Sequence, residues 1–307
     1  MGSRRAVTVT IDKPQEWTAK TERGAVPLIR FIVWIALALG RPVARWLLYP
    51  ICVYFLLFST SSRRASRQYL AKVLDRQATL FDVFRHYRTF AACLLDRVFL
   101  LNDQLHLFDL QVHGEEIVLD ILKRGSGCIL LGAHFGSFEA ARALGRQQPD
   151  LRISLVMYEE NARKIGSVLN AINPSLATDI IALGRPETMI EVGLRLDQGG
   201  FVGVLADRGV RGEAQIRHPF LGAPAAFQPG PFRMAALLKR PVVLMVGVYR
   251  GGRRYDIFFE HLLDPADMSP RGRAGEADKA MRRYVERLEH YCRMAPFNWF
   301  NFYDFWA

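Results

Sequence analysis

The stretch CILLGAHFGSFE, residues 128–139, joins a short apolar run directly to the start of an amphipathic segment. The run 128–133 has the length and composition of a buried strand. Gly136 and Ser137 are typical turn residues, and Ser137 is placed to cap a helix that contains Glu139. We therefore expect a strand that passes at once into a helix, with His134 emerging at the carboxyl end of the strand.

The same alternation continues on both sides of this stretch. Strand-sized apolar runs are separated by helix-sized amphipathic segments, which is the pattern of repeated βαβ units. The expected strands lie at 110–112, 128–133, 152–157, 179–183 and 201–206, and the expected helices at 115–123, 138–147, 160–172 and 186–198. The sequence therefore predicts an α/β fold, with a mostly parallel sheet flanked by helices.

Three further segments complete the predicted fold. Val242–Tyr249 and Tyr255–His261 flank a Gly-Gly turn, which predicts a hairpin added antiparallel to the sheet. Residues 276–293 have the pattern of a final helix, and residues 64–101 show helical spacing throughout.

The N-terminal region differs from the rest of the chain in its amino-acid composition. Residues 25–58 are densely apolar, interrupted by Arg41, Pro42 and Arg45, and a basic cluster follows between residues 63 and 76. This pattern predicts a membrane anchor with its basic end toward the cytoplasm, and a pair of helices buried in a soluble core is the alternative. The expected divisions are a tail (1–24), membrane-anchor helices (25–62) and one α/β domain (63–307).

The charge of the chain bears on its partners. Lys and Arg number 41 against 30 Asp and Glu, a formal net charge of +11, which suits anionic lipid, an acidic protein or nucleic acid. Nucleic acid is disfavoured, because the aromatic residues lie in apolar runs and not between arginines. The sequence therefore favours an acidic protein and a membrane surface as partners.

Metal centres and disulfides are not expected. The four cysteines form no Cys-x-x-Cys pair, which excludes zinc ribbons and thioredoxin-type motifs and favours a reducing compartment. The histidines other than His134 are scattered without the spacing of metal ligands.

His134 and Glu139 are the candidate catalytic residues. Ligands of open α/β sheets bind at the carboxyl ends of the strands, so we expect both side chains in one crevice. A neutral imidazole can remove a proton from a hydroxyl, and a carboxylate on its second nitrogen fixes the tautomer. No Gly-x-Ser-x-Gly elbow supplies a serine nucleophile, so the hydroxyl would come from a substrate.

The segment from His134 to Glu139 resembles the His-x-x-x-x-Asp/Glu motif of the glycerolipid acyltransferase superfamily, in particular the late acyltransferases of lipid A synthesis. Three downstream segments are similar to that family in the same order. They are ADRG at 206–209, FLGAPAAFQPG at 220–230 and APFNWFN at 295–301. The resemblance covers roughly residues 25–302.

The resemblance implies transfer of a fatty acyl group from a carrier thioester, on acyl carrier protein or CoA, to a hydroxyl of a membrane lipid or glycolipid. It makes His134 the general base and Glu139 its orienting carboxylate, without metal or bound cofactor. It places the enzyme at the cytoplasmic face of a bacterial inner membrane. The substrate-binding residues that it implies are Phe135, Gly136, Ser137, Asp207, Arg208, Gly209, Pro229 and Gly230.

Two segments depart from the lipid A enzymes. Tyr158-Glu159-Glu160-Asn161 replaces a Tyr-Arg-Pro-x-x-Asn motif, and the aromatic ending 298–306 replaces an arginine-rich one. This ending looks more like acyltransferases associated with aryl-polyene and xanthomonadin-type pigments. Other interpretations stay open at this stage: a plain turn at 207–209, a capped core helix at 229–240, or a non-catalytic lipid-binding or carrier-docking protein.

Overall fold

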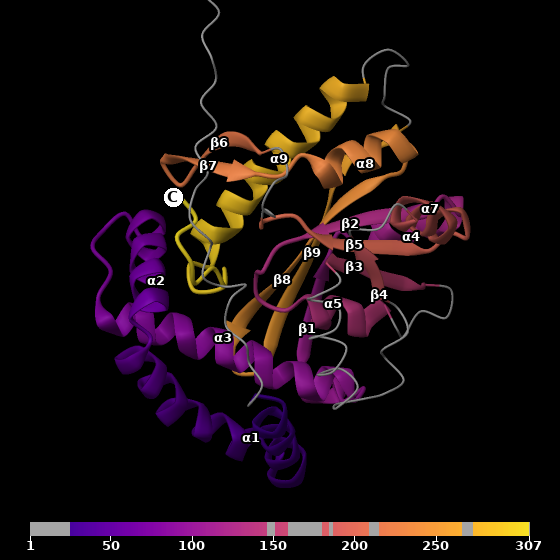
Figure 1. Cartoon of the computed structure of the whole chain (residues 1–307). Coiled ribbons are helices and arrows are strands. Elements are labelled where there is room, and N and C mark those ends of the chain that lie inside the picture. The colour runs from indigo at the N-terminus through magenta and orange to yellow at the C-terminus, as the bar shows by residue number, and fades with distance from the viewer. Residues whose placement is uncertain are drawn as a thin grey trace, which may run out of the picture.

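The computed structural model describes residues 25–145, 151–158, 180–183, 187–208, 215–265 and 273–306. Its centre is a seven-stranded sheet in the order β1-β9-β8-β2-β5-β3-β4 (Figure 1). The strands are β1 (Asp109–His113), β2 (Cys128–Gly132), β3 (Ile153–Tyr158), β4 (Ile180–Leu183), β5 (Phe201–Leu205), β8 (Val242–Gly251) and β9 (Arg254–Leu263).

All the strand pairings in this sheet are parallel except one. β8 and β9 form an antiparallel hairpin, and Gly251 and Gly252 supply the positive φ angles of its turn. β2 lies between β8 and β5 and is parallel to both. The predicted α/β class and the predicted antiparallel hairpin are therefore confirmed.

Helices cover both faces of the sheet, because its central strands are apolar on both sides. In β2, Ile129 and Leu131 pack into one core cluster and Leu130 into the other. The first cluster includes buried residues of α7 (Thr188–Asp197), α8 (Gly230–Leu238) and α9 (Arg273–Met294). The second includes residues of α3 (Leu80–Leu101), α4 (Glu115–Arg124) and α5 (Phe138–Gly145).

The N-terminal helices are divided differently from the prediction. α1 (Ala25–Phe58) is kinked at Gly40, whose φ is 77°. α2 (Thr60–Val73) begins two residues after the end of α1, so the expected boundary at residue 62 falls inside α2. The helical pattern expected over 64–101 is interrupted before α3. There Thr79 and Asp82 form a capping box, in which each side chain accepts a hydrogen bond from the other's backbone N–H.

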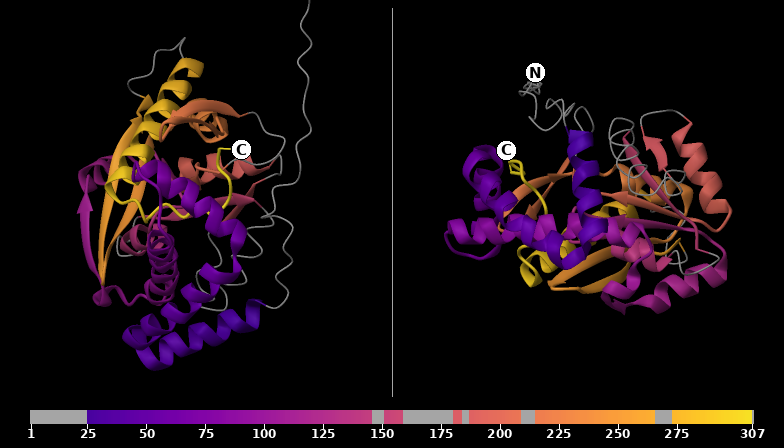
Figure 2. Two further views of the ribbon diagram at one scale, coloured as in Figure 1. Left: turned by 90° about the vertical axis from the view of Figure 1, so that its left-hand side faces the viewer. Right: turned by 90° about the horizontal axis from the view of Figure 1, so that it is seen from below.

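α1 packs along α3 on the outside of the domain, as both views of Figure 2 show. The two helices are joined by a carboxylate: Asp96 of α3, with a fully buried side chain, accepts two hydrogen bonds from Arg41 at 2.7 and 2.8 Å. Arg45 lies 3.5 Å from the same carboxylate, and the Tyr255 hydroxyl donates to it at 2.8 Å. The outward face of α1 stays exposed, so burial of this helix in the core, which the alternative expected, is not observed.

The C-terminal aromatic segment packs into the domain. A second, two-stranded sheet, β6 (Ile216–Phe220) and β7 (Ala223–Phe227), was not expected from the sequence. The ring of Phe220 at the end of β6 contacts those of Trp299, Phe305 and Trp306. The hairpin and the chain end therefore form one aromatic layer.

The Asp96 carboxylate predicts a large effect on stability. Asp96→Ala should lower the free energy of unfolding by about 3 kcal/mol or more, because it leaves two partly buried guanidinium groups without their counterion. The measurement is urea unfolding in a mild detergent, followed by circular dichroism.

Asp109→Ala is the matched control for this experiment. Asp109 pairs with Arg253 at 3.2 Å, and both side chains are more than half exposed, so its loss should cost about 0.5 kcal/mol or less. Equal effects of the two substitutions would contradict the structural role assigned to Asp96.

Candidate active site

His134 lies just beyond the carboxyl end of β2, where the sequence placed it. Its carbonyl oxygen accepts a hydrogen bond of 2.7 Å from the backbone N–H of Phe300, and Phe135 forms an isolated bridge with Trp299. The C-terminal segment thus continues the sheet hydrogen bonding past the end of β2. This pairing fixes the backbone on which His134 is carried.

The contact between the turn after His134 and β8 needs a glycine on each side. Gly136 has a φ of 51°, and a Cβ atom there would overlap the carbonyl oxygen of Gly247 in β8. A Cβ on Gly247 would in turn overlap the backbone of Ser137. The two backbones approach closely enough for the Ser137 N–H to donate to the Gly247 carbonyl at 2.8 Å. The turn is therefore held against the neighbouring strand without space for side chains.

Ser137 caps α5, as predicted. Its hydroxyl oxygen accepts a hydrogen bond of 3.2 Å from the backbone N–H of Ala140, the third residue of the helix. The cap starts the helix immediately after the turn, and Glu139 therefore lies in its first turn.

The imidazole of His134 is hydrogen-bonded to Asp207. Nδ1 lies 2.9 Å from Oδ1 of Asp207, a residue just beyond the end of the neighbouring strand β5. Because an ionised carboxylate can only accept, Nδ1 carries the proton and Nε2 keeps its lone pair. Nε2 has no hydrogen-bond partner among the described residues. The pair thus presents a neutral imidazole whose free nitrogen can accept a proton.

Asp207 is itself fixed by three donors. Besides the ring of His134, its Oδ2 accepts hydrogen bonds of 3.0 Å from the backbone N–H of His134 and from the indole N–H of Trp299. Burial favours the neutral carboxyl, but the charges of His134 and Arg208 and the two hydrogen bonds from His134 outweigh it and lower the pKa of Asp207 to about 2. The carboxylate is therefore ionised at neutral pH.

The electrostatics at His134 favour the neutral ring. Burial lowers the pKa of His134 below its usual value of 6.5, and the nearby charge of Arg208 lowers it further, against the opposing effect of Asp207. His134 is consequently unprotonated near pH 7 and able to act as a base.

Glu139 does not occupy the position expected for it. Its carboxylate accepts a hydrogen bond of 2.9 Å from Arg97 of α3, and Arg142 lies 3.7 Å away. The reason is the 100° step between successive helical residues. Phe138 faces Gly132 and Gly203 of the sheet. Because Glu139 is the next residue of the helix, its side chain points in a different direction, toward α3. The prediction that Glu139 orients the His134 ring is therefore wrong in this structure, and Asp207 has that position.

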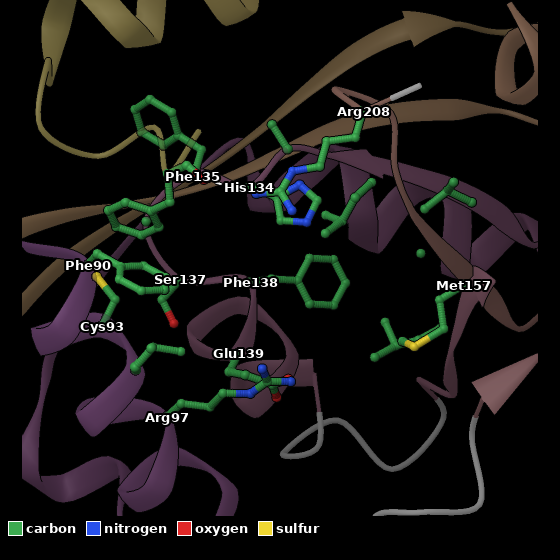
Figure 3. Close-up of a pocket in the computed structure, with 18 of the residues that line it drawn as sticks. Phe90, Cys93, Arg97, His134, Phe135, Ser137, Phe138, Glu139, Met157 and Arg208 are labelled. Atoms are coloured by element: carbon green, nitrogen blue, oxygen red, sulfur yellow. Dashed lines mark hydrogen bonds and ion pairs between the residues drawn. The ribbon is translucent and has the colours of Figure 1, made fainter. Parts of the chain in front are cut away.

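A cavity of about 340 Å³ connects these groups. In Figure 3, His134 and Arg208 lie close together at one end, Arg97 and Glu139 lie at the other, and the ring of Phe138 stands between them. Most of the exposed lining is apolar, with side chains from α3, β3, β4 and β5 that include Phe90, Leu94, Leu155, Val156, Met157, Leu183, Val204 and Leu205. The cavity thus combines a polar reaction site with a hydrocarbon-like wall.

The other predicted site residues divide into three groups. Phe135, Gly136, Ser137 and Arg208 line the cavity together with His134 and Glu139. Pro229 and Gly230 begin α8 and are not among the lining residues, and a Cβ on Gly230 would meet no atom, so no close approach requires glycine there. Gly209 lies outside the described residues.

Trp299 and Arg97 are the residues that sequence reasoning missed. Trp299 belongs to the segment 295–301, which the sequence marks only by its family resemblance. It is fully buried, and its indole N–H donates to Asp207. Arg97 occurs within a helical pattern that contains several other arginines, and nothing in that pattern distinguishes it.

The family of the chain follows from comparison with known sequences. Residues 15–307 match the sequence model of the bacterial lipid A biosynthesis acyltransferases. The chain belongs to this family. A search of curated proteins returned no match. The match covers nearly the whole chain and does not separate the pigment-associated subgroup from the rest of the family.

The charges around the imidazole of this acyltransferase predict opposite titration shifts for two variants. Arg208→Gln should raise the pKa of His134, because it removes a positive charge that disfavours the imidazolium, and Asp207→Asn should lower it. The measurement is NMR titration of ¹³C-labelled histidine, with His134→Gln to assign the resonance. Arg208→Lys, which keeps the charge, is the control, and an unchanged midpoint in Arg208→Gln would contradict the electrostatic assignment.

Proposed function

We propose that this protein is a membrane-bound O-acyltransferase that moves an acyl chain from a thioester to a hydroxyl of a lipid or glycolipid. The family membership supports acyl transfer. The observation that carries the mechanism is the hydrogen bond between His134 Nδ1 and Asp207 Oδ1. It leaves Nε2 free to remove the proton from the hydroxyl of an acceptor alcohol. His134 is the proposed catalytic base, and Asp207 is its positioning residue.

The proposed reaction needs one proton shuttle. Nε2 of His134 takes the proton of the acceptor hydroxyl while its oxygen forms a bond to the thioester carbonyl carbon. The tetrahedral intermediate then breaks its carbon–sulfur bond, and the imidazolium returns the proton to the thiolate. The products are an ester and a free thiol. The Asp207 carboxylate stabilises the imidazolium without taking its proton.

Arg208 is the proposed electrostatic stabiliser of the intermediate. The backbone N–H groups of residues 135, 136 and 137 all donate within the protein, to the carbonyls of Ala133, Asn298 and Gly247, so they do not form an oxyanion hole. Arg208 lines the cavity near His134, and its guanidinium is anchored by a hydrogen bond of 2.9 Å to the carbonyl of Phe300. A fixed positive charge at this place favours a developing oxyanion.

The donor is proposed to be acyl carrier protein, with acyl-CoA as the alternative. The apolar wall of the cavity suits a fatty acyl chain, and the net charge of +11 would attract a strongly acidic carrier protein. No bound cofactor is proposed. In the described part of the chain no cluster of three potential metal ligands occurs.

The proposed acceptor is a lipid or glycolipid alcohol, and lipid A precursors and the aryl-polyene type of acceptor are both compatible with the family. The segment with two acids at Glu159 and Glu160, which distinguishes this chain from the lipid A enzymes, lies outside the described residues except for Tyr158. We propose anionic inner-membrane lipids as the surface on which both substrates meet, at the cytoplasmic face, and no nucleic-acid partner.

The base assignment is tested by His134→Ala. Acyl transfer from radiolabelled acyl carrier protein to a membrane lipid extract should fall by at least about a thousandfold, because the variant lacks the proposed base for the acceptor proton. Thin-layer chromatography measures the labelled lipid. Wild-type turnover in this variant would refute the mechanism, and a wild-type protein that yields no acylated lipid would indicate a binding module instead.

Asp207 and Glu139 should behave differently in the same assay. Asp207→Asn should lower kcat by about 10⁴, because the amide N–H favours the wrong imidazole tautomer. Glu139→Gln should have a much smaller effect on kcat, because Glu139 contacts Arg97 and not the imidazole. A larger loss in Glu139→Gln than in Asp207→Asn would restore the sequence-based assignment.

A further inference from the structure

Between Val33 and Phe58 the outward face of α1 has no charged residue. Between Val33 and Phe58 the large side chains that are exposed are all apolar or aromatic: Trp34, Leu37, Leu39, Val43, Trp46, Leu47, Tyr49, Val53, Tyr54, Phe55, Leu57 and Phe58. A surface helix of a soluble domain normally shows the opposite pattern, with polar residues outward. A face of this size and composition marks a contact with apolar surroundings.

The inward face of α1 is packed on the domain over most of its length. Val33, Ala36, Ala44, Leu48 and Cys52 are buried, and α1 contacts α3. The helix therefore lies along the surface of the domain instead of projecting from it, and Figure 2 shows the same arrangement in two directions.

By length and composition the helix Val33–Phe58 could cross a membrane. Its contacts oppose a crossing. Arg41 and Arg45, in the middle of α1, are held by Asp96, and both also donate to the carbonyl of Gly252 in the β8–β9 turn. To span the bilayer, α1 would have to leave α3, which would place two guanidinium groups in hydrocarbon and leave Asp96 buried without its counterions.

We propose that α1 lies in the plane of the membrane, with its apolar face in the hydrocarbon of one leaflet and its arginine face on α3. The proposal rests on the membrane attachment in the proposed function, and it replaces a spanning anchor by an interfacial one. Exposed Arg64 and Arg67 follow α1 on α2, where anionic lipid headgroups would complement their charge. The Tyr54 and Phe58 rings, 4.9 Å apart, suit the interfacial region.

The same arrangement connects the membrane surface with the cavity. α3 carries α1 on one side, and through Phe90, Cys93, Leu94 and Arg97 it contributes to the cavity wall. An interfacial α1 therefore holds the wall of the reaction site next to the leaflet from which a lipid alcohol would come.

The test measures how deeply four positions on α1 lie in a lipid bilayer. Val43, Leu47, Tyr54 and Phe58 are all exposed and lie within about 60° of one another around the helix. Each is replaced by cysteine in turn, labelled with an environment-sensitive fluorophore, and bound to vesicles of phosphatidylethanolamine and phosphatidylglycerol. Quenching by lipids brominated at different depths then locates each label. The native cysteines are buried, and the unsubstituted chain should take up no label under the same conditions.

An interfacial helix predicts similar depths at all four positions, within one leaflet. A spanning helix predicts depths that change by about 20 Å from residue 43 to residue 58, because each residue adds about 1.5 Å. That gradient would overturn the proposal. Absence of quenching at all positions would also overturn it, because the face would then be covered by protein, such as a second copy.

A matched pair of substitutions tests the lipid contact separately from catalysis. Trp46→Glu combined with Phe58→Glu should lower partitioning into these vesicles at least tenfold. Leu237→Glu changes an exposed side chain of α8, at the opposite face of the sheet, and should leave partitioning unchanged. Equal partitioning of all variants would contradict the proposal. Because partitioning needs no acyl transfer, its result is independent of the His134→Ala assay.

Discussion

The site depends on one buried carboxylate. Asp207 accepts hydrogen bonds from the ring and the backbone of His134 and from the indole of Trp299, so it joins the ends of β2 and β5 to the C-terminal segment. A carboxylate with a fully buried side chain is stable only when its oxygens are paired, and here the hydrogen bond to the ring also sets the tautomer of the imidazole. The tautomer of His134 and the position of the chain end thus have a common origin.

The two ends of the cavity have different electrostatic character. At one end Arg208 and Asp207 act on His134 in opposite senses, and burial decides in favour of the neutral ring. At the other end Glu139 lies between Arg97 and Arg142, so this group joins α5 to α3 and keeps one net positive charge. The surface between them is mostly apolar, as the proposed acyl-chain site requires.

α3 links the parts of the molecule that the proposals concern. Its buried Asp96 holds α1 on the outside, while other side chains of the helix line the cavity. The exposed apolar residues of α1 are not stabilised by contact with water. The arginines on the inner face of α1 hold it on the domain, and in the proposed arrangement a leaflet covers its outer face. The region that the sequence describes as an anchor therefore belongs structurally to the same body as the reaction site.

The sequence by itself determined the sheet, the place of His134 and the cap of α5. Each of these depends on neighbouring residues: an apolar run of strand length, a glycine turn, and a hydroxyl that bonds to the third residue of the helix that follows. The partner of His134 could not be found in this way, because Asp207 is 73 residues away and reaches the ring only when β5 aligns beside β2. Glu139 was the nearer carboxylate in the chain, but the helical step directs it to Arg97. Local periodicity can be deduced from the order of residues, whereas hydrogen bonds between distant residues exist only after the strands have paired.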